Sequence, residues 1–347
     1  MEIVRKLRKI LLIQTAFIGD VVLATPVVEA LAKAYPDAAI DFIVKKGNEE
    51  ILSGHPLLNE VIVFNKKEKI RSLISIIRQV RKRKYDLVVN MHRFGSSGII
   101  AFLSNASNIS GFDKNPFSFS YDYKVKHIIN ANSLHETKRN LQLIEPFAML
   151  EDHRPRLYLT DEIKQRVLSY KTSKYVCIAP ASVWYTKQLP RQKWVELINE
   201  LAKDDVTIYL IGGPGDTGLN DSIIKSVQYG KVYNLAGKLS IKESAALMEN
   251  AVLNYVNDSG PLHFASAMNA PVCAVFCSTV PGFGFGPLSD FSRVIEVRNK
   301  PECKPCNLHG HKTCPQGHFK CADIHISDLV DVYREAKKVY DANEMIA

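Results

Sequence analysis

The sequence has 347 residues, of which 46% are apolar and 23% charged, which excludes disordered, collagenous and coiled-coil proteins. At about 150 residues per domain, the length predicts two domains. Lysine and arginine outnumber aspartate and glutamate by 45 to 36, and the net charge of +9 favours an acidic partner: a phosphate, a nucleic acid or an anionic lipid surface.

The beginning of the sequence does not predict secretion. Residues 1–9 are basic, but the apolar run at 10–13 is too short for a signal core. No window of about 18 apolar residues is present, so we expect no membrane span. These features predict a cytoplasmic protein with reduced thiols.

The first half of the chain alternates between predicted strands and helices. Strands are expected at 10–13, 40–44, 61–64 and 87–90, with helices at 20–36 and 70–82. Residues 105–155 are less regular and end in a helical stretch at 134–150. Such alternation is typical of βαβ units, and it predicts an α/β fold with a parallel sheet.

The alternation restarts in the second half. Strands are expected at 175–179, 206–211, 232–235, 253–257 and 271–276, and helices at 190–203, 241–250 and 325–342. We therefore expect an N-terminal Rossmann-like domain at 1–160, a C-terminal one at 161–325, and a C-terminal helix at 326–347 that packs back on the first domain. The site is expected in a cleft at the carboxyl ends of the strands.

Two loops at predicted strand-to-helix junctions carry candidate site residues. The first, residues 15–20, contains Thr15, Gly19 and Asp20; Gly19 allows a tight turn, and Asp20 is either a helix cap or a general base. No G-x-G-x-x-G follows the strand, so this is not a dinucleotide fingerprint. The second is Asp258-Ser-Gly-Pro-Leu-His263, where amides at a helix start could bind an anion.

Two further loops follow strands of the second half. Residues 180–190 contain Ser182 and Lys187, and Lys187 is either a phosphate-binding charge or a solvated lysine. The turn Gly212-Gly-Pro-Gly-Asp216 offers Asp216 as a ribose ligand or as a turn residue.

Four cysteines, Cys303, Cys306, Cys314 and Cys321, lie within 19 residues and are interleaved with histidines. They could form a structural zinc site, but their spacing is not that of a standard finger or ribbon. The alternative is a set of thiols without metal. A basic run at 66–84 surrounds an apolar stripe; its charged face is either solvated or contacts an anionic membrane.

Together, Gly19-Asp20, Thr25-Pro26 and the motif at 258–263 resemble the ADP-heptose:lipopolysaccharide heptosyltransferase family over nearly the whole chain. The members of this family are inverting glycosyltransferases of GT-B architecture, with two facing Rossmann-like domains and a cleft between them. The cysteine-rich tail is similar to the heptosyltransferase II branch. Leu189-Pro190 stands where the family commonly has Trp-Pro, and this difference bears on the sugar used.

The resemblance implies a role for each matching residue. Asp20 matches the catalytic base, which replaces the cap interpretation, and Lys187 matches the lysine that binds the donor diphosphate. The diphosphate segment matches Ser259, Gly260 and Leu262, whereas Pro261 has no amide hydrogen to donate. Other matches are Asp258 for the donor sugar, His263 as the motif histidine, and Asp216 for the ribose. Thr15, Gly19 and Ser182 would support the loops.

The resemblance further implies a nucleotide-sugar donor, a lipopolysaccharide acceptor at the inner face of the cytoplasmic membrane, and no required metal or cofactor. One alternative is a GT-B transferase that uses another nucleotide-sugar for a different surface glycan. The other is a non-catalytic nucleotide- or nucleic-acid-binding protein, suggested only by the net charge. Residues 66–84 contain no aromatic side chain that could stack on a base, so we expect no nucleic acid partner.

Overall fold

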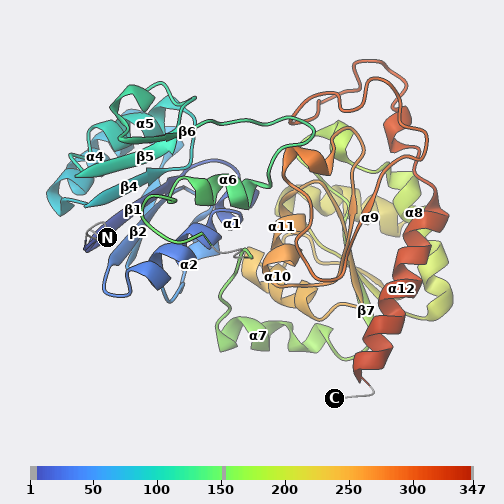
Figure 1. Ribbon diagram of the computed structural model, residues 1–347. Coiled ribbons are helices and arrows are strands. Elements are labelled where there is room, and N and C mark those ends of the chain that lie inside the picture. The colour runs from blue at the N-terminus through green and yellow to red at the C-terminus, as the bar shows by residue number, and fades with distance from the viewer. Residues whose placement is uncertain (1–5, 151–153, 345–347) are drawn as a thin grey trace. The chain divides into compact units, whose positions relative to one another are not determined.

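The computed structural model describes residues 6–150 and 154–344, and the chain divides into two compact units. The first unit comprises Met1–Ile129 and Leu134–Tyr158, and the second comprises Asn130–Ser133 and Leu159–Ala347. Each unit contains one six-stranded sheet with helices packed on it (Figure 1). Among the described residues, no helix is both long enough and apolar enough to cross a membrane.

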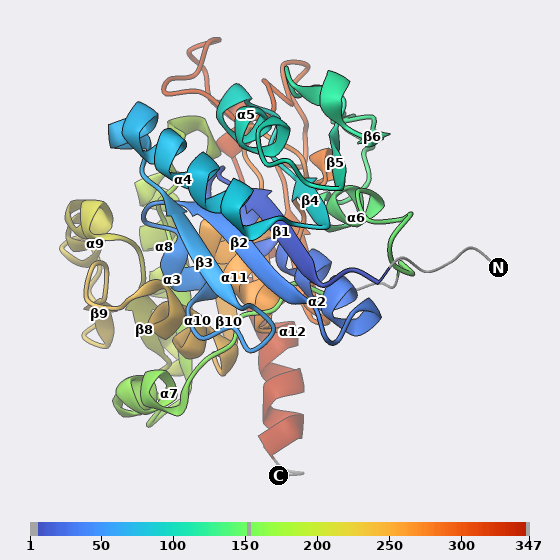
Figure 2. The ribbon, with the colours of Figure 1, turned by 90° about the vertical axis from the view of Figure 1, so that its left-hand side faces the viewer.

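The first unit contains a parallel sheet in the order β3-β2-β1-β4-β5-β6. Its strands are β1 Lys9–Gln14, β2 Ala39–Lys45, β3 Glu60–Phe64, β4 Leu87–Asn90, β5 Asn108–Phe112 and β6 Tyr123–Val125. Its helices are α1 Ile18–Val22, α2 Thr25–Ala34, α3 Glu49–Leu52, α4 Lys69–Arg83, α5 Gly95–Phe102 and α6 Glu136–Gln142. Helices α4 and α5 cover one face of this sheet, and α1, α2 and α6 the other (Figures 1 and 2).

The second unit repeats this connectivity in the order β12-β11-β10-β7-β8-β9, again with parallel pairing. Its strands are β7 Tyr175–Ala179, β8 Thr207–Leu210, β9 Val232–Asn234, β10 Leu253–Asn257, β11 Val272–Val275 and β12 Ser292–Ile295. Its helices are α7 Asp161–Val167, α8 Arg191–Leu201, α9 Thr217–Ile224, α10 Ile241–Glu249, α11 Gly260–Ala267 and α12 Ile326–Glu344. Both units are therefore Rossmann-like.

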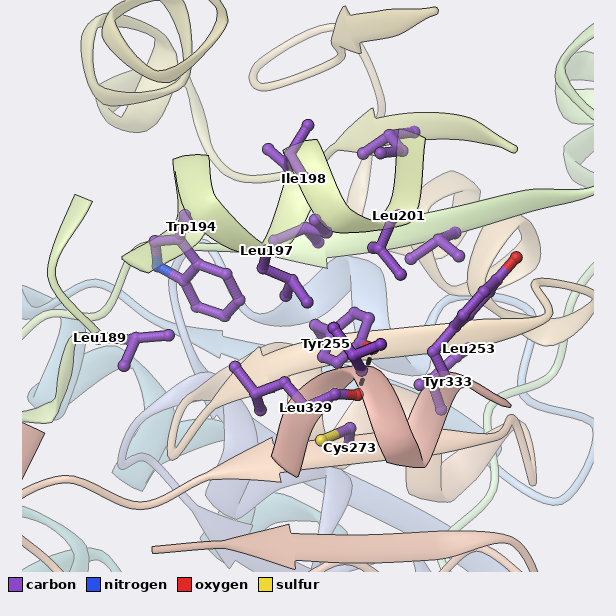
Figure 3. Close-up of a cluster of buried hydrophobic side chains, with 14 of the residues drawn as sticks. Leu189, Trp194, Leu197, Ile198, Leu201, Leu253, Tyr255, Cys273, Leu329 and Tyr333 are labelled. Carbon is purple, nitrogen blue, oxygen red and sulfur yellow. Dashed lines mark hydrogen bonds between the residues drawn. The ribbon is translucent and has the colours of Figure 1, made fainter. Parts of the chain in front are cut away.

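The core of the second unit lies between its sheet and helices α8, α9 and α12 (Figure 3). Trp194 and Leu197 of α8 are fully buried, and the Tyr255 hydroxyl of β10 donates a hydrogen bond of 2.8 Å to the Leu329 carbonyl of α12. Burying a large apolar side chain stabilises a fold by about 1.5–3 kcal/mol. The last helix was expected to pack back on the first domain; the structure instead makes α12 part of the second unit's core, because its apolar side meets α8 and β10.

The helix predicted at 20–36 is two helices. Pro26 lies in the first turn of α2, where its missing N–H costs nothing, but its ring would clash with a continuous helix from α1. The Thr25 hydroxyl bonds to the Val22 carbonyl at 2.8 Å and closes the junction. The chain consequently ends α1, the short helix that contains Asp20, and starts α2 as a separate helix.

Residues 130–133 belong to the second unit although the residues on both sides belong to the first. The Ser133 amide donates to the Gly282 carbonyl at 2.9 Å. Position 282 accepts no side chain, because a Cβ there would lie 1.8 Å from the Ala131 carbonyl oxygen. This short excursion of the chain was not predicted.

Candidate active site

In each sheet the strand order reverses at one point, between β1 and β4 in the first unit and between β7 and β10 in the second. At such a point the loops after the two strands leave in opposite directions and open a crevice at the carboxyl edge, where α/β proteins bind ligands. The predicted loops at 15–20, 180–190 and 258–263 all begin at these edges. The sequence therefore placed them correctly.

Asp20 is half-buried in the first turn of α1. Its Oδ2 accepts a hydrogen bond of 3.0 Å from the Phe17 amide, as a helix-capping carboxylate does. The cap interpretation thus describes its local geometry, and the bond also sets the orientation of the carboxylate. Gly19 is buried inside α1 and is not in the left-handed region, so the expected tight turn at Gly19 is wrong.

Thr15 is fully buried directly after β1. Its hydroxyl lies 2.9 Å from Nδ1 of His92, which follows β4, and its carbonyl accepts a bond of 2.7 Å from Nζ of Lys66. Burial lowers the pKa of His92 to about 3, and the charges of Lys66 and Arg93 add to this effect. Burial, together with Lys45 and Lys69, lowers the pKa of Lys66. The edge beside Asp20 is therefore cationic, with a neutral histidine at its base.

Sequence reasoning missed His92 and Arg93. The signal was present: the two residues follow the buried strand β4, just as Thr15 follows its neighbour β1. Parallel strands place residues at the same register on one edge, so residues just beyond β4 had to lie near the 15–20 loop.

The second unit brings two predicted residues into direct contact. Lys187 Nζ lies 2.6 Å from Asp258 Oδ2, and both side chains are largely buried, with 14% and 8% exposed. The Thr279 hydroxyl donates to the same oxygen at 2.6 Å. Thr279 was not predicted, although it follows β11 and so lies at the same edge. The three side chains form one polar cluster beside the reversal of strand order.

The helix after Asp258 offers fewer amides than its sequence suggested. Ser259 is the N-cap of α11, Pro261 has no N–H, and the Leu262 amide donates to the Ser259 carbonyl at 3.1 Å. Leu262 is also fully buried, so its predicted contact with a ligand is not supported by the structure. The amides of Ser259 and Gly260 are the ones that remain at the start of the helix. His263 is buried, and its ring packs against Phe285 with 6.4 Å between centroids.

Asp216 and Ser182 lie near the same edge but make local contacts. Asp216 Oδ2 accepts a bond of 2.8 Å from the Gly213 amide, and a Cβ at Gly212 would lie 2.7 Å from this oxygen. The carboxylate therefore folds back on its own glycine turn. The Ser182 carbonyl accepts a bond of 2.6 Å from the Gln188 side chain, which ties the two ends of that loop together.

The seven cysteines are all free thiols. Burial raises the pKa of Cys306, and the thiols of Cys303 and Cys314 raise it further. Within 6–150 and 154–344, however, no group of three or more His, Cys, Asp or Glu side chains is arranged to hold a metal ion.

Comparison with known proteins adds to this geometry. The sequence profile of glycosyltransferase family 9 (heptosyltransferase) matches residues 73–318, more than half of the chain. The chain belongs to this family. It is 29% identical over 275 residues to lipopolysaccharide heptosyltransferase 3 of Escherichia coli K12, covering 75% of this chain and 80% of that protein.

Solved structures show the same fold. E. coli ADP-heptose lps heptosyltransferase II superposes with a TM-score of 0.79 at 19% identity, covering 96% of this chain and 99% of that one. The E. coli heptosyltransferase WaaC with ADP gives 0.72 at 19% identity, covering 94% and 99%. The predictions of α/β class, GT-B architecture and heptosyltransferase family are therefore confirmed. As a member of family 9, this protein is a glycosyltransferase.

Proposed function

We propose that this family 9 glycosyltransferase moves a heptose from ADP-heptose to a sugar of the lipopolysaccharide inner core, with inversion at the anomeric carbon. The relative named above is a lipopolysaccharide heptosyltransferase, and a structural neighbour was solved with ADP, which supports both the sugar and the nucleotide. The observation that carries the proposal is the Lys187–Asp258–Thr279 cluster at the strand-order reversal of the second unit.

In this proposal the second unit binds the donor. Lys187 and the amides of Ser259 and Gly260 bind the diphosphate, and Asp258 accepts hydroxyl hydrogen bonds from the donor sugar. Asp216 would bind the ribose through the part of its carboxylate that does not cap Gly213. When the diphosphate leaves, its developing charge meets a lysine and a helix N-terminus that are already in place, which is electrostatic stabilisation of the transition state.

The first unit would bind the acceptor. Asp20 takes the proton of the attacking hydroxyl, and its bond from the Phe17 amide keeps the carboxylate oriented for that task. A base that activates a hydroxyl on one face of the sugar, with the nucleotide leaving from the other, gives inversion. The cationic edge formed by Lys66 and Arg93 suits an acidic acceptor.

No divalent metal is needed in this mechanism, because Lys187 and the start of α11 supply positive charge at the diphosphate. We further propose that the enzyme works in the cytoplasm at the inner face of the membrane. The outer side of α4 is basic and exposes Ile70 and Ile74, with 74% and 45% of each residue accessible. We propose that this side of α4 contacts the membrane. Arg83 would not take part in this contact, because it pairs with Asp41 at 2.6 Å and with Glu60.

The test is a binding and transfer screen with ADP-, GDP- and UDP-sugars. Calorimetry should show tight binding of ADP-heptose, and mass spectrometry should show addition of one heptose to a truncated inner-core acceptor. Tight binding and transfer of a UDP-sugar instead would overturn the heptose assignment and favour a different surface glycan, for which Leu189 in place of the family's tryptophan is the first residue to change.

A further inference from the structure

Thr186, the residue before Lys187, is held by two different segments of the second unit. It is 1% exposed. Its hydroxyl oxygen accepts hydrogen bonds from the His311 amide at 2.8 Å and from the Ser278 hydroxyl at 3.0 Å. Its amide donates to the His311 carbonyl at 3.1 Å, and its carbonyl accepts from the Ser278 amide at 3.2 Å. Every polar group of this residue is thus engaged.

His311 comes from the cysteine-rich segment, and the turn before it touches the lysine itself. Gly310 has φ +77°, in the left-handed region that favours glycine. A Cβ added there would lie 3.1 Å from Cγ of Lys187 and 3.1 Å from Oγ1 of Thr186. The turn at 307–311 therefore lies against the aliphatic stem of Lys187 and leaves it little room.

The same segment is anchored at a second place, the end of β11. Lys304 is buried, and its Nζ donates to the Phe276 carbonyl at 2.6 Å and pairs with Glu296 at 2.7 Å. The Cys306 amide donates to the Ser278 carbonyl at 3.0 Å. Ser278 thus joins the cysteine-rich segment to Thr186. The next residue in the loop after β11, Thr279, donates a hydrogen bond to Asp258.

We infer that the cysteine-rich segment at 303–311 is a positioning device for Lys187, and that Thr186 is the positioning residue through which it acts. A lysine stem has four rotatable bonds and loses side-chain entropy when a ligand fixes it. Here the turn at 310 and the bonds to Thr186 fix the stem before any ligand binds, so the ammonium group is already beside Asp258. Such preorganisation raises affinity without adding a contact.

The test compares two threonine variants in the full chain. Thr186→Val keeps the shape and the backbone bonds but cannot accept from His311 and Ser278, whereas Thr186→Ser keeps an acceptor. Calorimetry should show that Thr186→Val weakens ADP binding about tenfold and that Thr186→Ser stays within about twofold, as expected for the loss or retention of one or two hydrogen bonds. Thr207→Val is the matched control, because Thr207 is also buried and hydrogen-bonded, to Ser173 at 3.2 Å.

A double-variant cycle separates positioning from general support. If Thr186 acts through Lys187, adding Thr186→Val to Lys187→Ala should not weaken ADP binding further. If the double variant instead shows the product of the two single losses in ADP affinity, the inference is overturned. Gly310→Ala provides a second route, and it should weaken ADP binding as Thr186→Val does. Its control is Gly317→Ala, which lies beyond that segment; φ is also positive there, at +70°, but an added Cβ would meet no atom within 4 Å.

The ADP measurements rest on the proposed function, because they assume that the second unit binds the donor nucleotide. A second measurement therefore observes Lys187 without any nucleotide. After reductive ¹³C-dimethylation, which keeps the charge, the NMR resonance of Lys187 can be assigned with Lys187→Arg. This resonance should shift and sharpen in Thr186→Val and stay in place in Thr207→Val. An unchanged resonance in Thr186→Val would overturn the positioning role. Failure of the wild type to bind ADP, with the resonance shifted as expected, would instead contradict the proposed donor.

Discussion

Replacing Lys187 by alanine should affect stability and nucleotide binding by separate mechanisms. The substitution leaves the Asp258 carboxylate largely buried, with Thr279 still donating to it at 2.6 Å. Removing one partner of a buried ion pair lowers the free energy of unfolding by about 3–5 kcal/mol. Because Thr279 still donates to the carboxylate and the pair is partly exposed, we expect a loss at the lower end, about 3 kcal/mol. For a unit of this size, that lowers Tm by about 6–12 °C.

The same substitution should weaken ADP binding about tenfold to hundredfold, because a charge-assisted hydrogen bond to phosphate contributes about 1.5–3 kcal/mol. Differential scanning fluorimetry measures Tm, and calorimetry measures ADP affinity. The double variant Lys187→Met/Asp258→Asn removes both charges; it should recover most of the Tm and none of the affinity. This combination tells a ligand-binding lysine from a merely structural one.

Lys231→Ala is the matched control. Lys231 pairs with Asp205 at the same distance, 2.6 Å, but the two side chains are 48% and 74% exposed. Pairs exposed to this extent contribute little to stability, so Tm should barely change. The reasoning is refuted if Lys187→Ala behaves like this control in Tm and also binds ADP as the wild type does.

Three other predictions follow from the two units. Asp20→Ala should lower the free energy of unfolding by about 1 kcal/mol because the Phe17 amide loses its acceptor, and Asp20→Asn should lower it by less; equal losses in urea titrations would contradict the capping bond. The pKa of His92 is about 3 in the folded chain, so between about pH 6.5 and pH 3 the unfolded chain binds a proton at this residue and the folded chain does not. The free energy of unfolding should therefore fall as the pH drops through this range, by up to about 1.4 kcal/mol per pH unit. His92→Gln should flatten this slope, although His127, whose pKa is lowered to about 4, will retain part of it; an unflattened slope would exclude His92 as the source. Excess EDTA should leave the transfer rate unchanged, and a loss of rate on chelation would contradict the metal-independent mechanism.

Most of the strands that the sequence predicted are buried along their length, although the predicted edge strands β3 and β9 are partly exposed. Strands such as β1 and β7 are almost continuous apolar runs, which is typical of buried parallel strands. Strands β5, β6 and β12 were missed. In β5, Ser110 and Gly111 interrupt the apolar pattern, and a Cβ at Gly111 would lie 2.4 Å from the Tyr121 ring. A packing demand of this kind appears only once the ring is placed.

The candidate site was predictable in position and much less so in detail. Loops that follow buried parallel strands gather at the carboxyl edge of their own sheet, which made Asp20, Lys187 and Asp258 candidates, and the family resemblance gave each of them its expected role. That Lys187 meets Asp258, and that Thr279 joins them, depends on the register of β10 and β11 and on the path of a loop. The docking of the turn at 307–311 on Thr186 depends on irregular backbone, for which periodicity gives no signal.

The central claim is that Asp20 removes the acceptor's proton while the second unit holds the donor. Single-turnover transfer by Asp20→Asn tests it most directly, because asparagine can still accept from the Phe17 amide but cannot act as a base. We predict that the rate of transfer falls by about 100- to 10,000-fold while the affinity for ADP stays within about twofold of the wild type. Transfer within about tenfold of the wild-type rate, with the same ADP affinity, would contradict the assignment.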